Sequence, residues 1–424
     1  MNNTRIRERL EKLNPNWLSI FTMLMAFSTY TFMYAFRKPY TAATFADAPG
    51  FFGLGFKEIL VISQVAGYAL SKFIGIKVVS EMDSGRRARI LLLLIGVAEL
   101  ALLGFALVPP PYSFVFLFLN GLPLGMIWGL TFSYVEGRKQ TEIIGLGICA
   151  SFIFGSGFVK DVGKLLMEAG VSEYWMPFTT GLVFSLPIIA MVYMLNQVPP
   201  PTLADEAART KRVPMSGAER KAFFQKFALG LVLLIVAYTA LSAYRDFRDN
   251  FLADIWGELS GSDYNFSQTE TPASIIVLLS LMLLVLVKDN FKALMYNHVA
   301  IFLGFVMAGL STWAFQEEMI SAYLWILMTG IATYVAYIPF NTILFDRMIA
   351  TTQEASNVGF LIYLADAFGY LGSVSVLLYK DFGARDLSWV EFFTQSSYAL
   401  AWVGGIGTLL AMGYFARKLK VEAS

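Results

Sequence analysis

Apolar runs of roughly 20 residues recur about twelve times along this chain, with short polar connections between them. A helix of that length crosses the hydrocarbon core of a bilayer, so each run predicts one transmembrane helix. The third and fourth runs are separated only by Pro109-Pro110-Pro111, which predicts a sharp turn. The predicted spans are residues 17–44, 56–79, 90–108, 112–134, 142–166, 175–196, 223–250, 272–287, 293–314, 321–345, 355–379 and 391–416. The pattern therefore predicts an all-α integral membrane protein.

The longest polar connection runs from Asn196 to Lys221 and is rich in proline and mixed charges. It is too short to be a domain, and it divides the predicted spans into two sets of six. We therefore expect an N-terminal six-helix bundle over residues 1–196, a cytoplasmic linker over 197–221 and a C-terminal six-helix bundle over 222–424.

A short sequence match between the first and seventh spans indicates that the two bundles are repeats of one another. Phe36-Arg37-Lys38-Pro39-Tyr40 in the first span matches Phe247-Arg248-Asp249-Asn250-Phe251 in the seventh, and each arginine lies far into its span. Parallel repeats of this kind are typical of major facilitator transporters, whose sites lie at the repeat interface. The expected fold is thus two pseudo-symmetric six-helix bundles.

Composition supports the membrane assignment and narrows the chemistry. Only 15% of the residues are charged and 57% are hydrophobic, whereas soluble domains carry about a quarter charged residues. The net charge of +1 argues against a nucleic-acid partner. The single cysteine, Cys149, and the single histidine, His298, leave no internal disulfide and little basis for a metal site or a histidine base. We expect no cofactor, no metal and no enzymatic activity.

Charges in the connections predict the orientation. By the positive-inside rule, the side richer in lysine and arginine is cytoplasmic, which places both termini there in a multi-pass protein of the cell (inner) membrane. The run after the basic N-terminus is too long for a signal peptide, so we expect no cleavage. The basic connections contain Arg5, Arg7, Arg9, Lys12, Arg86, Arg87, Arg89, Arg138, Lys139, Lys288, Lys292, Arg347, Arg417 and Lys418.

Two cations lie within the first two spans, each beside tyrosines. On one helix, Tyr30, Tyr34 and Arg37 fall on a common face. Lys72 follows Tyr68 by one turn in the second span. Charged residues within a span usually face a protein interior or a water-filled path. The alternative is a long side chain that reaches the membrane surface.

The seventh span holds a second charged cluster. Arg245 and Asp249 are four residues apart and are expected to pair, which leaves Arg248, over Tyr244, as the freer cation. The alternative is a salt-bridge cluster at the outer membrane surface. In the fifth span, Lys164 is expected to pair with Asp161 in a structural cluster.

The eleventh span carries Tyr363, Asp366 and Tyr370 on one face. Asp366 is a candidate proton relay or a partner for a cation in a cavity, and the alternative is a packed, neutral carboxyl. Asn120 and Trp128 of the fourth span are expected to be packing residues.

At these residues the chain resembles the organophosphate:phosphate antiporter branch of the major facilitator superfamily. That branch implies a twelve-helix fold in which arginines of the first and seventh helices hold the phosphoryl group of the substrate. The matching positions are Arg37 and either Arg248 or Arg245, with Lys72 and the tyrosines in the same cavity. A fifth-helix histidine of that branch is absent, and a sister family is the alternative. The resemblance rests on Tyr34-Ala35-Phe36-Arg37-Lys38, Tyr68-Ala69-Leu70-Ser71-Lys72-Phe73-Ile74, Phe118-Leu119-Asn120-Gly121, Gly125-Met126-Ile127-Trp128 and Phe368-Gly369-Tyr370-Leu371-Gly372.

The sequence thus favours a monomeric secondary transporter in the lipid bilayer that exchanges a small organic anion, preferably a phosphate ester, for phosphate. Arg37 and Arg248 are the expected clamp because guanidinium forks match phosphate oxygens. Lys72 adds charge, and Asp366 balances the cations when the substrate is absent. Hydrogen bonds are expected from Tyr30, Tyr34, Tyr68 and Tyr370. The alternatives are a transporter-like membrane sensor of a phosphorylated ligand and a proton-coupled carboxylate or sugar transporter.

Overall fold

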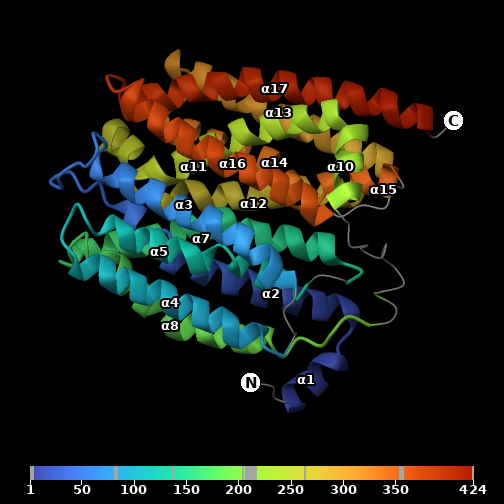
Figure 1. Ribbon diagram of the computed structural model, residues 1–424, viewed down its shortest axis with the longest axis horizontal. Coiled ribbons are helices and arrows are strands. Elements are labelled where there is room, and N and C mark those ends of the chain that lie inside the picture. Colours follow the sequence, from blue (N-terminus) through green and yellow to red (C-terminus); the bar gives the residue numbers. More distant parts are fainter. Residues whose placement is uncertain are drawn as a thin grey trace. The chain divides into compact units, whose positions relative to one another are not determined.

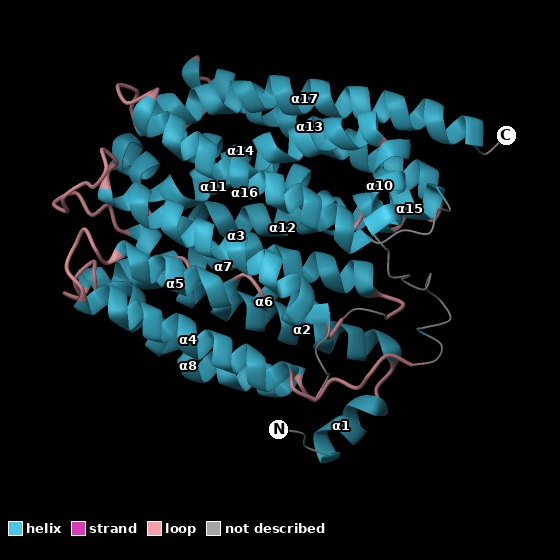
Figure 2. Cartoon of the chain, viewed as in Figure 1, coloured by secondary structure: helices cyan, strands magenta, loops and turns pink. Residues whose placement is uncertain are grey.

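The computed structural model describes residues 4–80, 85–135, 138–202, 205, 217–261, 264–352 and 358–422. All of the regular structure in these ranges is helical, as Figure 2 shows. Within them, ten helical segments are long and apolar enough to cross a membrane. The helices α3 (Phe56–Ser80) and α16 (Val358–Phe382) supply the second and eleventh of the twelve predicted spans. The prediction of an all-α membrane fold is confirmed.

Each predicted span overlaps one long helix or a pair of shorter ones, with differences at some ends (Figure 1). Those before the linker are α2 (Pro15–Met33), α3, α4 (Arg87–Leu107), α5 (Phe114–Leu124) with α6 (Ile127–Phe132), α7 (Thr141–Glu168) and α8 (Met176–Leu195). Those after it are α11 (Ala228–Ser260), α12 (Phe266–Val285), α13 (Asn290–Gln316), α14 (Ala322–Thr342), α16 and α17 (Trp389–Glu422). The shorter helices are α1 (Thr4–Glu11), α10 (Gly217–Lys226) and α15 (Leu344–Thr352).

The first span differs most from its prediction, because its helix does not continue to Arg37. The α-helix ends at Met33 and gives way to two 3₁₀ turns, η1 (Tyr34–Phe36) and η2 (Pro39–Ala42). Arg37 between them has a non-helical backbone, with φ −121° and ψ −47°. Pro39 accounts for the break, since its ring would clash with the carbonyl of the residue four positions earlier in a continuous helix. The common helical face expected for Tyr30, Tyr34 and Arg37 is therefore wrong.

The eighth span begins at Phe266, six residues before the predicted start. Asp161 of α7 accounts for the difference, because its carboxylate accepts the backbone N–H groups of Phe266 at 2.7 Å and Ser267 at 2.8 Å. A carboxylate there satisfies donors that the first helical turn leaves open and complements the helix dipole. Asp161 thus acts structurally, as expected, but through α12.

The chain divides into two compact units, unit 1 (Met1–Arg209 with Asn250–Thr271) and unit 2 (Thr210–Asp249 with Pro272–Ser424). Unit 1 therefore includes the end of α11 and the start of α12. In unit 1, α3 and α5 approach closely at Gly121, where an added Cβ would lie 2.3 Å from the backbone oxygen of Gln64. Figure 1 shows α4 beside α8 in unit 1 and α13 beside α17 in unit 2, and both pairs are in contact.

Candidate functional site

The broken segment of the first span is held by side-chain amides in place of helical hydrogen bonds. Asn120 of α5 donates to the carbonyl oxygen of Phe36 at 2.9 Å, and Gln64 of α3 donates to that of Arg37 at 2.9 Å. Gln64 also donates to the Asn120 side-chain oxygen at 2.8 Å. Tyr40 donates to Gln64 at 3.3 Å. Sequence reasoning missed this role for Asn120, which is a buried amide serving backbone carbonyls and not a packing residue alone.

We expect Asn120→Leu to lower the free energy of unfolding by about 3 kcal/mol. Asn120 also donates to the carbonyl oxygen of Ala98 at 3.0 Å. Leucine removes this hydrogen bond, the one to Phe36 and the one from Gln64, so that two buried carbonyls and one buried amide each lose a partner. Denaturant titration of the purified protein in detergent measures the change. Asn16→Leu is the control, because Asn16 is exposed. Equal stability of both variants would contradict the role of Asn120.

Unit 1 brings together the two cations predicted from the first two spans. The Arg37 guanidinium carbon lies 4.1 Å from the centre of the Tyr68 ring, and the Lys72 ammonium lies 5.4 Å from the same centre. Tyr30 packs edge-on against Tyr34, with ring centres 5.6 Å apart. Two cations on one phenol ring give a positively charged site with hydrogen-bond donors nearby, which suits an oxyanion.

In unit 2, Arg245 takes a different partner from the one predicted. Its guanidinium pairs with Asp246, with Nη2 2.5 Å from Oδ1, and lies 4.0 Å from the centre of the Tyr337 ring. Asp246 is the adjacent residue, and the expected pair with Asp249 is not formed. The Asp246 carboxylate is oriented by Ser373 of α16, whose hydroxyl donates to Oδ2 at 2.7 Å.

Arg248 is the more enclosed of the two arginines, whereas Arg245 is ion-paired as predicted, although with Asp246 and not with Asp249. Its Nη2 donates to the carbonyl oxygen of Ile326 at 3.0 Å. An added Cβ on Gly330 would lie 2.7 Å from that nitrogen, so Arg248 packs closely against α14. Arg248 is 2% exposed, whereas the Arg245 side chain is 14% exposed. Helical spacing within α11 could not predict this difference in exposure, because the difference comes from packing against another helix, α14.

Asp366 lies in a polar network of unit 2. The Tyr238 hydroxyl donates to Asp366 Oδ1 at 2.6 Å. The Tyr238 ring stacks on Tyr337, the same ring that contacts Arg245, with centres 5.5 Å apart. A chain of contacts thus connects Arg245 with Asp366. Tyr370 is half-buried on α16, and the side chain of Tyr363 lies outside the described residues.

The end of α11 is fixed within unit 1 by residues that sequence reasoning did not select. Lys57 of α3 forms a buried ion pair with Asp254, with Nζ 2.5 Å from Oδ2, and donates to the carbonyl oxygen of Thr41 at 3.1 Å. Lys38 donates to the side-chain oxygen of Asn250 at 2.8 Å. We call these the α11-end contacts. Their only sequence signal is a lysine and an aspartate at span ends on the same side of the membrane.

Sequence reasoning also did not select the carboxyl of Glu99. Glu99 in the middle of α4 faces α8, where an added Cβ on Gly181 would lie 2.0 Å from Oε2. Both of its carboxyl oxygens are buried, and neither has a hydrogen-bond partner among the described residues. An acidic residue within an apolar run is the signal that marks it. The described residues contain no group of three His, Cys, Asp or Glu side chains suited to a metal ion.

Comparison with known proteins identifies a family and a fold. Residues 39–418 match the model of a family of unknown function, DUF5690. No curated protein matches the chain. Among solved structures, a mutant of the nucleoside transporter NupG has a TM-score of 0.58 at 12% identity, over 94% of this chain and all of that one.

Two further structures are similar over almost the whole chain. A bacterial homologue of the human drug peptide transporters PepT1 and PepT2 has a TM-score of 0.61 at 14% identity, covering 95% of this chain and 99% of that one. A POT family transporter in complex with 5-aminolevulinic acid has a TM-score of 0.57 at 10% identity, covering 96% and 97%. At such identities the likeness establishes the fold, which is that of the major facilitator transporters.

Proposed function

Since the chain belongs to this family of unknown function, we propose a function from its fold and its charged residues: secondary transport of a small organic anion by alternating access. The observation that carries this proposal is the placement of Arg37 and Lys72 on the Tyr68 ring in unit 1, 4.1 and 5.4 Å from its centre. The fold is shared with structures of nucleoside and peptide transporters. The protein acts as a monomer in the inner membrane, with both termini in the cytoplasm.

A phosphate ester is the substrate class that this chemistry favours. The Arg37 guanidinium presents paired donors that match two phosphate oxygens, while Lys72 adds a point charge. Tyr30 and Tyr34 supply hydroxyl groups within the same unit. In unit 2, Arg248 and Arg245 both remain candidates for the second arginine, since Arg248 is 2% exposed and the Arg245 guanidinium is paired with Asp246. Inorganic phosphate is the counter-substrate in the exchange.

Proton-coupled uptake is a second candidate, and Glu99 is the observation that favours it. A carboxyl within a span, without a hydrogen-bond partner among the described residues, is a group that transporters use to carry protons. Asp366 is less suited to this role, because it accepts a hydrogen bond from Tyr238 and is part of a polar network. In exchange, Asp366 instead offsets part of the positive charge of the site when the substrate is absent. A sensor remains an alternative, and measurable flux separates it from transport.

Flux into proteoliposomes tests the proposal. Vesicles loaded with phosphate should take up labelled glycerol 3-phosphate by counterflow, without a pH gradient and in preference to glucose or acetate. Lys72→Gln should lower the uptake by about 10-fold, since one charge on the anion loses its partner. Arg89→Gln is the control, because Arg89 is exposed at the start of α4. Uptake that requires an inward proton gradient would replace exchange with the proton-coupled function, and no uptake of any anion would overturn transport.

A further inference from the structure

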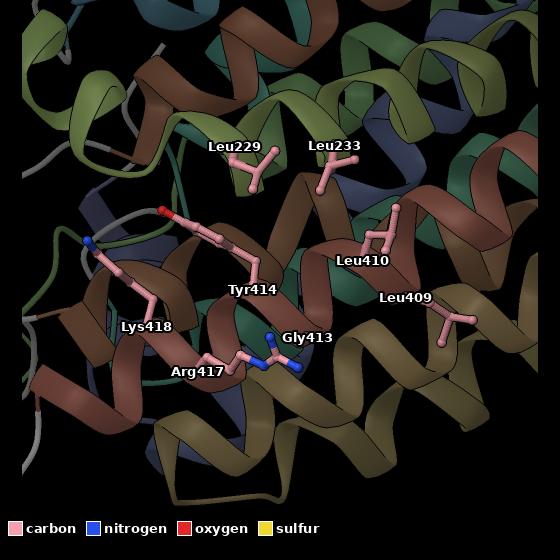
Figure 3. A pocket seen from close by; sticks show the side chains of 8 residues that line it. All are labelled: Leu229, Leu233, Leu409, Leu410, Gly413, Tyr414, Arg417 and Lys418. Atoms are coloured by element: carbon pink, nitrogen blue, oxygen red, sulfur yellow. The ribbon is translucent and has the colours of Figure 1, made fainter.

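A groove opens within unit 2 between the first turns of α11 and the last turns of α17, as Figure 3 shows. Its volume is about 770 Å³, within the range of about 300–1,000 Å³ that is typical of small-molecule sites. One part is apolar and the other carries two cations. The lining residues are Leu229, Leu233, Leu409, Leu410, Gly413, Tyr414, Arg417 and Lys418.

The apolar part of the groove faces outward from unit 2. Leu229, Leu409 and Leu410 are all exposed, and they belong to apolar spans that cross the membrane. An added Cβ on Gly413 would meet no atom within 4 Å, so this position forms an open floor. At this depth the surrounding medium is hydrocarbon, so an acyl chain is the natural cover for these leucines.

The charged part of the groove lies where α17 leaves the apolar layer. Arg417 and Lys418 follow Phe415 and Ala416 and lie within the last turn of the span, which ends at Leu419. Figure 3 shows the Lys418 ammonium and the Tyr414 hydroxyl at the same end, with the Arg417 side chain pointing back along α17. None of the residues that line the groove is acidic. This end therefore complements an anion at headgroup depth.

We propose that this groove binds one anionic phospholipid, with its phosphate near the Lys418 ammonium and the Tyr414 hydroxyl, Arg417 adding positive charge nearby, and an acyl chain along the leucines. The charged end of the groove matches the anionic headgroup of such a lipid, and the apolar part matches its acyl chain. Basic pockets between helices at the cytoplasmic face are a recurring form of headgroup recognition. A soluble phosphate compound would leave the leucine surface uncovered. The proposal does not depend on the transported substrate, because the groove lies outside the polar network of unit 2.

Native mass spectrometry of the detergent-solubilised protein with added phosphatidylglycerol tests this site. The parent protein should retain one phosphatidylglycerol molecule in preference to phosphatidylcholine. Each cation near an anionic headgroup contributes roughly 5-fold, so Arg417→Gln with Lys418→Gln should weaken retention by about 30-fold. Gly413→Trp keeps both charges but fills the floor, and it should also reduce retention of the lipid.

The matched control is Arg86→Gln with Arg89→Gln, which removes two exposed cations near the start of α4. This variant should retain phosphatidylglycerol like the parent. Unchanged retention in the Arg417/Lys418 variant would overturn the site. Equal losses in that variant and in the control would also overturn it, because they would indicate attraction by surface charge in general. Loss in the charge variant but none in Gly413→Trp would refute the acyl-chain groove.

Discussion

Arg37→Lys should lower transport of the anion by about 10–100-fold although the positive charge is kept. A guanidinium donates two parallel hydrogen bonds to one oxyanion while its plane lies on an aromatic ring, and an ammonium does not. Arg37 already holds this stacked position, with its guanidinium carbon 4.1 Å from the Tyr68 ring centre. Losing one charge-assisted hydrogen bond costs about 1.5–3 kcal/mol, which gives the expected range. Counterflow in proteoliposomes measures the effect.

The matched control for this prediction is Arg86→Lys, the same chemical change at an exposed position. It should leave transport unchanged. Tyr68→Phe separates the two functions of the ring, because it keeps the face on which Arg37 lies and removes only the hydroxyl. Parent-like transport by Arg37→Lys would exclude Arg37 from anion binding, whichever substrate is used.

The spans were predictable because the bilayer imposes one length on every apolar run, and that length is visible in the sequence. The break after Met33 was not predicted, although Pro39 alone indicates that a helix cannot continue undisturbed through this segment. A break is stable only where other groups satisfy the freed carbonyls. Here those groups are Gln64 and Asn120, which lie in two other helices and have no pattern linking them to the first span.

The choice between Arg245 and Arg248 shows a second limit of sequence reasoning. Helical spacing lists possible partners, and it favoured Asp249, four residues from Arg245, because adjacent residues such as Asp246 do not face each other on a helix. The selection is made by neighbouring helices: Ser373 orients Asp246, and α14 encloses Arg248 at Ile326. Tertiary packing of this kind leaves no periodic signal in either helix. The pairing of Lys72 with Tyr68 in unit 1 was easier to predict, because the two residues are one turn apart within one helix.

The α11-end contacts give the prediction with the largest expected energy. Lys57 and Asp254 are only 4% and 9% exposed, and their charged atoms are 2.5 Å apart. Removing one partner leaves the other charge buried, at a cost of about 3–5 kcal/mol. Lys57→Ala and Asp254→Ala should therefore each accelerate hydrogen exchange of the backbone amides around residues 250–260 by at least 100-fold.

The double variant Lys57→Met with Asp254→Leu should recover much of the lost protection, because replacing a buried ion pair by apolar side chains costs far less than breaking it. Lys292→Ala, at an exposed position, is the control and should exchange like the parent. The result bears on alternating access, because it tests whether the transport cycle includes a step in which the end of α11 leaves α3. If the single variants exchange like the parent, the ion pair does not hold α11 in place. If they exchange faster but transport at the parent rate, the contact holds α11 without limiting the transport cycle.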